Sequence, residues 1–133
     1  MKTENESKIQ QEIVQYIRKT YCKPEHEPRL ICMSVPNGIG LSVPNAVRLI
    51  VEKAIAVAIE LMKQIGLTVG ASDLQVHGVQ GRCMHIEVKT STGKQSDDQI
   101  KFQKRIQQLD GKYFLVRSLD DVKKINFDWL TEK

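Results

Sequence analysis

The sequence predicts a single α/β domain in which helices and strands alternate along the chain. At 133 residues it has the size of one ordinary domain, and 41% hydrophobic with 27% charged residues is the profile of a globular protein. Apolar residues recur at helical spacing in some segments and in short strand-like runs in others. No linker or low-complexity tract separates parts of residues 1–133, so one domain is expected.

The first helix and the first strand follow from two different patterns. Residues 5–20 carry apolar side chains at helical spacing, at Ile9, Ile13 and Ile17, which predicts an amphipathic helix. Residues 29–35 are short, rich in apolar side chains and followed by Pro-Asn-Gly, which predicts a strand that ends in a turn.

A second helix is predicted over about residues 46–65. Asn45 directly precedes it and is well placed as an N-cap, and Gly66 fits its C-terminal stop. The helix is apolar on most faces between Ala54 and Met62. We therefore expect it to be well buried.

A hairpin follows, made of strands at residues 73–79 and 83–89 with a turn that contains Gly78, Gln80 and Gly81. The two strands bring the region of Asp73 into lateral contact with the region of Glu87.

The last part of the chain predicts a helix, a strand and a final helix. Ser96 is a suitable N-cap for an amphipathic helix over residues 96–109. Residues 112–118 form a short apolar strand, and Ser118 opens a capping pattern for a last helix that extends through Ile125.

Composition and charge limit the classes of function. The net charge of +4 and a pI of about 9.0 are compatible with a polyanionic partner. Three cysteines, an odd count without CxxC or zinc spacing, are typical of free thiols in a reducing compartment. The N-terminus lacks an apolar signal region and the most apolar stretch is interrupted by charges, so an intracellular, cytoplasmic protein without a membrane span is expected.

An acidic constellation at the hairpin is the strongest chemical signal. Glu87 and Lys89 lie on one face of their strand because side chains alternate at period two. Asp73 can meet Glu87 across the hairpin, and with the backbone carbonyl of Val88 these two carboxylates would form a minimal Mg²⁺ or Mn²⁺ site. Lys89 would supply positive charge beside it. The alternative interpretation is a surface ion pair on an edge strand.

The segments "SDL", "IEVK" and "GKQSDDQIKF" together resemble the VRR-NUC branch of the PD-(D/E)XK nuclease superfamily. Matching positions in chain order run from about residue 6 to residue 122. They are Glu6, Ile9, Gln10, Ile13 and Val14, then Asn37 and Gly38, then Gly66, Gly70, Asp73 and Leu74, then Glu87, Lys89, Gly93, Ser96 and Gln99. The last match is a glycine, a strand and an acidic turn, in "DGKYFLVRSLDDV" at residues 110–122. Ser72 departs from the Pro that often precedes the aspartate in the superfamily.

The resemblance implies a restriction-endonuclease-like core, a small mixed sheet flanked by helices. It also implies a role for each matched position. Metal ligands would be Asp73, Glu87 and the Val88 carbonyl; catalytic residues would be Lys89, Gln99, Glu6 and Gln10; DNA contacts would be Asn37, Gly38, Lys94, Ser96 and Lys101. Glu6 shares a helix face with Ile9 and Ile13, an unusual place for a carboxylate without a partner, while Glu12 at the margin of that face is the competing candidate.

The function implied by the resemblance is a divalent-metal-dependent, structure-specific DNA endonuclease. Stand-alone proteins of this kind are associated with homodimers that cut branched DNA such as four-way junctions, and the small size suits a phage or other virus. A dimer supplies two related active sites for two equivalent strands. Aromatic residues are only 5%, which disfavours a stacking platform for single strands. The alternatives are a nuclease or nickase without junction specificity, and a nucleic-acid-binding module with a vestigial site.

Overall fold

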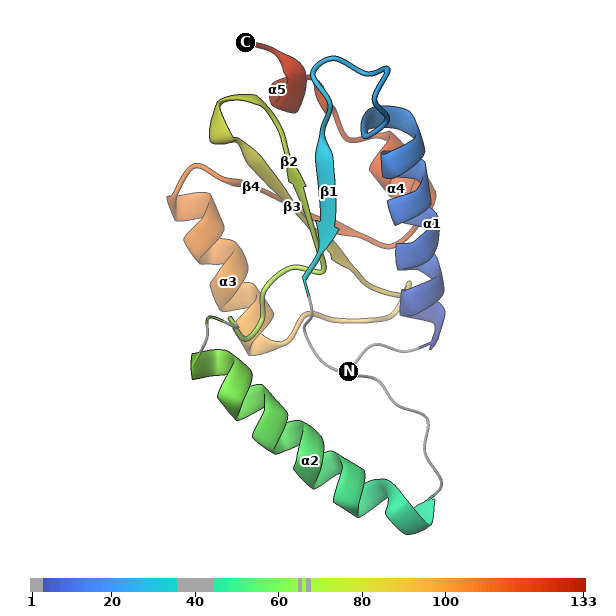
Figure 1. Ribbon diagram of the computed structural model, residues 1–133, viewed down its shortest axis with the longest axis vertical. Helices are drawn as coiled ribbons and strands as arrows, with labels where there is room; N and C mark the ends of the chain where they lie inside the picture. Colours follow the sequence, from blue (N-terminus) through green and yellow to red (C-terminus); the bar gives the residue numbers. More distant parts are fainter. Residues whose placement is uncertain (1–3, 36–44, 65, 67) are drawn as a thin grey trace.

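The computed structural model describes residues 4–35, 45–64, 66 and 68–133 of the chain. Four strands form one mixed sheet in the order β1-β2-β3-β4 (Figure 1). Their bounds are Ile31–Ser34, Leu74–His77, Cys83–Val88 and Lys112–Val116. The β1–β2 and β2–β3 pairs are antiparallel and the β3–β4 pair is parallel. The predicted α/β class and the small mixed sheet are therefore confirmed.

Helices cover both faces of this sheet. Their bounds are Glu4–Tyr21 for α1, Asn45–Gln64 for α2, Asp97–Gln108 for α3, Leu119–Lys123 for α4 and Asp128–Thr131 for α5, with a 3₁₀ turn at Val79–Gly81. α1 and α4 pack on one face and α3 on the other (Figure 1). β3 is consequently covered on both sides, and this explains why all its residues from 84 to 88 are buried.

Alternation along β3 divides its side chains between two environments. Met84, Ile86 and Val88 join the apolar core to which α1 contributes. His85 and Glu87 point to the opposite face, where they meet side chains of α3. One face of β3 therefore builds the core, and the other presents polar groups to the N-terminal half of α3.

The C-terminal segment differs from the single last helix that the sequence predicts. α4 ends at Lys123, before Ile125, and a second short helix, α5, begins at Asp128. Between them Asn126 accepts a hydrogen bond on Oδ1 from the backbone N–H of Asp128, at 2.8 Å. Such a side-chain turn competes with helix continuation, and it explains why α4 is not extended.

The prediction that the helix over residues 46–65 is well buried is wrong. Every described side chain of α2 is exposed or half-buried, with Ile50 70% and Leu49 64% exposed. Figure 1 shows α2 set apart from the sheet and from the other helices. Apolar faces predict that a helix is covered, but they do not say that its own chain covers it. Among the described residues, no helix has both the length and the apolar character needed to span a membrane.

Candidate active site

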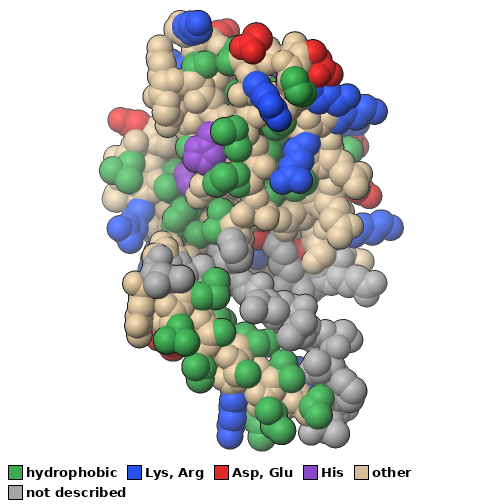
Figure 2. Space-filling view, viewed as in Figure 1, with side chains coloured by type: hydrophobic (Ala, Val, Ile, Leu, Met, Phe, Trp, Pro, Cys, Tyr) green, Lys and Arg blue, Asp and Glu red, His purple; other side chains and the backbone are tan. Residues whose placement is uncertain are grey.

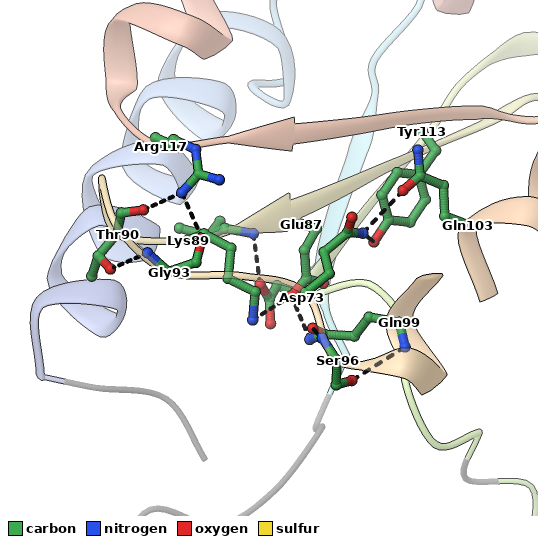
Figure 3. A network of polar contacts seen from close by, with 12 residues as sticks. Asp73, Glu87, Lys89, Thr90, Gly93, Ser96, Gln99, Gln103, Tyr113 and Arg117 are labelled. Carbon is green, nitrogen blue, oxygen red and sulfur yellow. Dashed lines mark hydrogen bonds and ion pairs between the residues drawn. The ribbon is translucent and has the colours of Figure 1, made fainter. Parts of the chain in front are cut away.

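Glu87 lies at the centre of a polar network at the carboxyl end of β3 (Figure 3). Its side chain has no exposed surface. One of its oxygens, Oε1, lies 3.2 Å from the Nζ atom of Lys89 and accepts a hydrogen bond of 2.6 Å from Nε2 of Gln99. The Lys89 side chain is only 12% exposed, so the ion pair is largely shielded from water. This is not the surface ion pair that the alternative interpretation of the sequence required.

Asp73 lies opposite Glu87 at the end of the β2–β3 pair. Leu74 is in register with Ile86, so the next antiparallel position outward pairs Asp73 with Glu87. Asp73 is 2% exposed, and its Oδ2 accepts a hydrogen bond of 2.7 Å from the backbone N–H of Val88. In an extended residue the N–H and C=O point to the same edge of the strand, so the Val88 carbonyl is directed to the side where Asp73 lies.

The start of α3 orients Gln99. Ser96 and Gln99 form a capping box, in which the Gln99 N–H donates to the Ser96 hydroxyl at 3.3 Å and the Ser96 N–H donates to Gln99 Oε1 at 2.9 Å. Since Oε1 is engaged by the backbone, the amide Nε2 is directed to Glu87. The same local motif that begins the helix therefore fixes a side chain of the site.

Gly70 allows α3 to approach this closely. Its φ of +80° is a conformation that favours glycine. A Cβ at this position would overlap the carbonyl group of Asp98 and lie 2.8 Å from the backbone nitrogen of Gln99. The matched glycine spacing before Asp73 thus has a physical reason: it lets the first turn of α3 rest on the loop that leads into β2.

Glu6 brings a third carboxylate to the same end of the sheet. It is 6% exposed, and its Oε1 lies 3.3 Å from the place where a Cβ on Gly93 would be. Glu12 is exposed. Of the two candidates on α1, Glu6 is therefore the one that lies against the turn after β3. Gln10 is half-buried one helical turn further along the same face.

Arg117, which sequence reasoning missed, holds that turn in place. Its Nη1 donates to the backbone carbonyls of Thr90 and, at 2.8 Å, of Gly93 (Figure 3). Within the turn, the Gly93 N–H donates to the Thr90 hydroxyl at 3.1 Å. The residues that follow Lys89 are thereby anchored to the end of β4. Contacts to backbone carbonyls across more than twenty residues leave no pattern in the sequence, so no signal could have identified Arg117.

Tyr113 and His85 line the buried side of the network. The sequence assigns no role to Tyr113, and strand alternation places His85 on the face of Glu87, where a packed, neutral histidine is the favoured prediction. Burial raises the pKa of the Tyr113 hydroxyl, and the negative charges of Glu87 and Asp73 raise it further, although a hydrogen bond with Gln95 opposes them. Burial lowers the pKa of His85, whose Nδ1 lies 3.0 Å from the hydroxyl of Ser72. His85 is therefore a packed, neutral group, and Ser72 has a structural partner of its own.

Three of the five predicted DNA contacts lie within the described residues and two lie outside them. Lys94, Ser96 and Lys101 are exposed, on the turn before α3 and on its first turns. The Nζ atom of Lys101 lies 3.9 Å from the Oδ1 atom of Asp98 on the same helix. Asn37 and Gly38 lie outside the described residues, and their predicted role stays a prediction.

The network has the chemistry of a site for a hard divalent cation. Two buried carboxylates and a backbone carbonyl meet at one end of the sheet, and oxygen ligands of this kind suit Mg²⁺ or Mn²⁺. Within the described residues, three or more His, Cys, Asp or Glu side chains do not gather into a metal-binding group. The fit therefore depends on the Asp73–Glu87 pair, completed by the Val88 carbonyl and by water.

Comparisons with known proteins agree with this architecture. No protein-family model matches the chain, and no curated protein is similar to it in sequence. A solved structure described as a "VRR_NUC domain protein" superposes with a TM-score of 0.53 at 14% sequence identity. The match covers 92% of this chain and 84% of the other. The two chains share a fold. It is the restriction-endonuclease-like fold that the sequence resemblance implied.

Proposed function

We propose that this protein is a divalent-metal-dependent endonuclease that hydrolyses phosphodiester bonds in DNA. The observation that supports it best is the burial of Glu87 beside Lys89, opposite Asp73. A buried carboxylate is costly, and a pair of buried carboxylates more so, unless a cation or hydrogen bonds offset the charge. Proteins retain such arrangements where the charge is needed for chemistry.

Asp73, Glu87 and the Val88 carbonyl would hold the metal ion. A bound Mg²⁺ or Mn²⁺ supplies a Lewis acid that activates water and neutralises charge on a phosphate. The protein has already oriented its ligands: the Val88 N–H fixes one oxygen of Asp73, and Gln99 fixes one oxygen of Glu87. These outer hydrogen bonds reduce the reorganisation that binding requires.

Lys89 is the residue that we assign to catalysis next to the metal ligands. Its ammonium group is held 3.2 Å from Glu87 at the end of β3, with a small part of the side chain still exposed. A cation in this position can stabilise negative charge that develops on the phosphate, or orient the attacking water. Glu6 and Gln10, from α1, would complete the polar environment on the other side of the turn.

The DNA itself is proposed to be branched, with four-way junctions as the leading candidate. Lys94 and Lys101 are exposed next to the site and can contact phosphates without reading bases. The scarcity of aromatic residues also favours recognition of backbone and shape. A homodimer would present two equivalent active sites to the two equivalent strands of a junction.

The test is a cleavage assay with the purified full chain. A labelled four-way junction and a linear duplex of matched sequence are incubated with Mg²⁺, Mn²⁺ or EDTA. We expect cleavage only with metal, preferentially of the junction, and a loss of more than about a hundredfold in Glu87→Gln. Glu12→Gln, the same change at an exposed glutamate, serves as the control and should cleave like wild type.

Three other outcomes are informative. Equal cleavage of the junction and the duplex would support the nuclease activity and contradict the proposed preference for junctions. Tight binding without cleavage in either metal would indicate a binding module with a vestigial site. Cleavage that is unchanged in Glu87→Gln would contradict the assignment of this network as the active site.

A further inference from the structure

A second hollow in the molecule lies between β4, α4 and α5, and we refer to it as the α5 cavity. Its volume of about 400 Å³ is that of a site for one small ligand. The lining includes two aromatic rings, two lysines, a carboxylate and an amide, at Phe114, Trp129, Lys112, Lys124, Asp121 and Asn126. Asp73, Glu87 and Lys89 are not among the residues that line it. Figure 2 shows the apolar side chains of α2 at the lower end of the molecule, whereas α5 lies at the upper end in the same view (Figure 1).

Two aromatic rings give the α5 cavity flat apolar walls. Phe114 is half-buried on β4, and Trp129 is half-buried on α5. Arg82, from the turn between β2 and β3, holds Trp129 in place. Its Nη1 donates to the backbone carbonyls of Trp129 at 2.6 Å and Glu132 at 2.7 Å, and its Cζ atom lies 5.7 Å from the centroid of the Trp129 ring. Because the indole is already positioned, a planar ligand can stack on it with little further ordering of the protein.

Two lysines bring positive charge to the same cavity. Lys112 and Lys124 are both exposed, and the Nζ atom of Lys112 lies 5.2 Å from the centroid of the Trp129 ring. A cation–π contact at an exposed position contributes only about 0.5–1 kcal/mol. The flexible stem of Lys112 can therefore turn its ammonium group from the ring to an anionic group of a ligand.

The α5 cavity also contains a hydrogen-bond acceptor and a donor. The Oδ2 atom of Asp121 accepts from the backbone N–H of Arg117 at 2.8 Å, and this hydrogen bond, with a smaller contribution from the charge of Lys124, lowers the pKa of the carboxyl. Asp121 is therefore ionised and can accept from N–H groups of a ligand. The Oδ1 atom of Asn126 accepts from the backbone N–H of Asp128 at 2.8 Å, and its NH₂ group can donate.

We propose that the α5 cavity binds a single nucleotide, with the base against Trp129 and Phe114 and the phosphate on Lys112 and Lys124. A nucleotide combines an aromatic ring, a hydrogen-bonding edge and a negative charge in one small ligand, and the cavity offers a partner for each of them. A simple anion would leave the aromatic walls without a contact, and an uncharged aromatic ligand would leave the lysines without one. The nucleotide is either a free mononucleotide or an unpaired residue of a DNA strand.

A DNA strand bound at the candidate active site can reach the α5 cavity. Asp121 binds the N–H of Arg117, whose side chain holds the turn after Lys89. Lys112 lies four residues before Val116 on β4, about 13 Å further along the strand. This second source of the nucleotide rests on the proposed function, and the first does not. A cavity for one base is not the row of aromatic residues that a single-strand platform needs, so it agrees with the low aromatic content.

The test uses the fluorescence of Trp129, the single tryptophan of the chain. The full chain in EDTA is titrated with deoxyadenosine monophosphate, and with deoxyribose 5-phosphate and deoxyadenosine as probes that lack the base or the phosphate. We expect saturable quenching by the mononucleotide with a dissociation constant of about 1 mM or lower, and binding of both truncated probes that is weaker by at least about tenfold.

A second titration distinguishes the two sources of the nucleotide. It compares a duplex that carries one unpaired adenine with the same duplex carrying an abasic residue at that position. Quenching by the mononucleotide alone would assign the cavity to a free nucleotide, and quenching by the unpaired adenine alone would assign it to a DNA strand. The absence of saturable quenching in both titrations would overturn the proposal, as would equal binding of deoxyribose 5-phosphate and the mononucleotide. Neither titration involves cleavage, so failure of the nuclease assignment would not affect the result with the mononucleotide.

Variants locate the binding in the α5 cavity. Lys112→Ala should raise the dissociation constant about fivefold through the loss of one phosphate contact, and Lys104→Ala, at an exposed lysine of α3 outside the cavity, should leave it unchanged. Trp129→Phe keeps an aromatic ring and Trp129→Leu removes it. With a fluorescently labelled ligand in place of the tryptophan signal, the Leu variant should bind at least about tenfold more weakly than the Phe variant. Circular dichroism confirms that each variant is folded. An affinity that is equal in wild type, Lys112→Ala and Trp129→Leu would overturn the proposal.

Discussion

At the scale of single residues, the most informative group is Glu87. Its side chain is fully buried, and the Nζ atom of Lys89 lies 3.2 Å from its Oε1 atom. A buried ion pair of this kind contributes little net stability, because desolvation of the charges offsets their attraction. The arrangement therefore has opposite consequences for variants that remove the carboxylate and variants that remove the cation.

Glu87→Gln should not destabilise the metal-free protein. The amide keeps the shape, and its oxygen can still accept from Gln99 and from Lys89. Removing one of two facing buried carboxylates also removes its desolvation cost and its repulsion with Asp73, which offsets the lost ion pair. In EDTA we expect a free energy of unfolding equal to wild type or higher by about 1 kcal/mol, measured by urea denaturation. Added Mn²⁺ should raise the melting temperature of wild type and leave that of the variant unchanged.

Lys89→Met provides the opposite case. It removes the cation that lies 3.2 Å from the buried carboxylate of Glu87 and should lower the free energy of unfolding by about 3 kcal/mol. If Glu87→Gln were instead several kcal/mol less stable than wild type in EDTA, the carboxylate would be retained for structure, and the functional interpretation of its burial would fail.

Sequence patterns located the residues of this network that lie on regular elements, and missed those that act across the fold. Strand alternation, a local rule, places Glu87 and Lys89 on one face, and the resemblance indicates Gln99 through the helix start that runs from Ser96 to Gln99. Arg117 and Tyr113 reach the network through tertiary contacts, to backbone carbonyls and to neighbouring charges. Such contacts depend on which strand lies beside which, and periodicity does not carry that information.

At the scale of elements, the site depends on how closely α3 approaches the loop before β2. Gly70 is the point of contact. Its φ is left-handed, and a side chain at this position would overlap the backbone of Asp98 at the start of α3. Gly81 has a similar φ, +71°, but no atom lies within 4 Å of a Cβ built there. Alanine substitutions at the two glycines therefore distinguish the free-energy cost of a strained backbone from the additional cost of displacing α3.

Gly70→Ala should destabilise the protein by more than about 2 kcal/mol, because strain and overlap with the start of α3 add together. Gly81→Ala, with backbone strain alone, should cost about 1 kcal/mol. Urea denaturation measures both. Displacement of α3 also moves Gln99 away from Glu87, so the stabilisation of Gly70→Ala by Mn²⁺ should be weaker than that of Gly81→Ala. Equal effects of the two variants would contradict the role given to the contact.

Burial is predicted correctly for the helices and strands that pack against the sheet and wrongly for α2, whose described apolar side chains are exposed or half-buried. α1 and the four strands place apolar side chains in the core, and α3 packs Phe102 against His85 and Tyr113 on the other face of the sheet, so their patterns and their environments agree. α2 has apolar residues on two sides, and an apolar pattern does not say whether the same chain covers it.

At the scale of the whole molecule, the polar residues of the candidate site gather at one end of the sheet. Asp73 before β2, Lys89 after β3 and the first turn of α3 meet there (Figure 3). Glu6, at the start of α1, lies against the turn that follows Lys89. The other end of α1, at Tyr21, lies about 22 Å from Glu6, given the rise of 1.5 Å per residue, and Lys23 follows it. A polyanion bound at the proposed site would therefore interact with some of the surface cations and not with others.

The salt dependence of DNA binding should report this asymmetry. In EDTA, where cleavage is prevented, fluorescence anisotropy gives the dissociation constant for a four-way junction at several salt concentrations. Lys94→Ala and Lys101→Ala should each reduce the slope of log affinity against log salt by about 0.9, the value for one phosphate contact on duplex DNA. Lys23→Ala, an exposed cation at the far end of α1, should leave the slope unchanged. If all three variants lowered the slope equally, binding would depend on the overall charge of +4 rather than on a phosphate-binding surface beside the buried carboxylates.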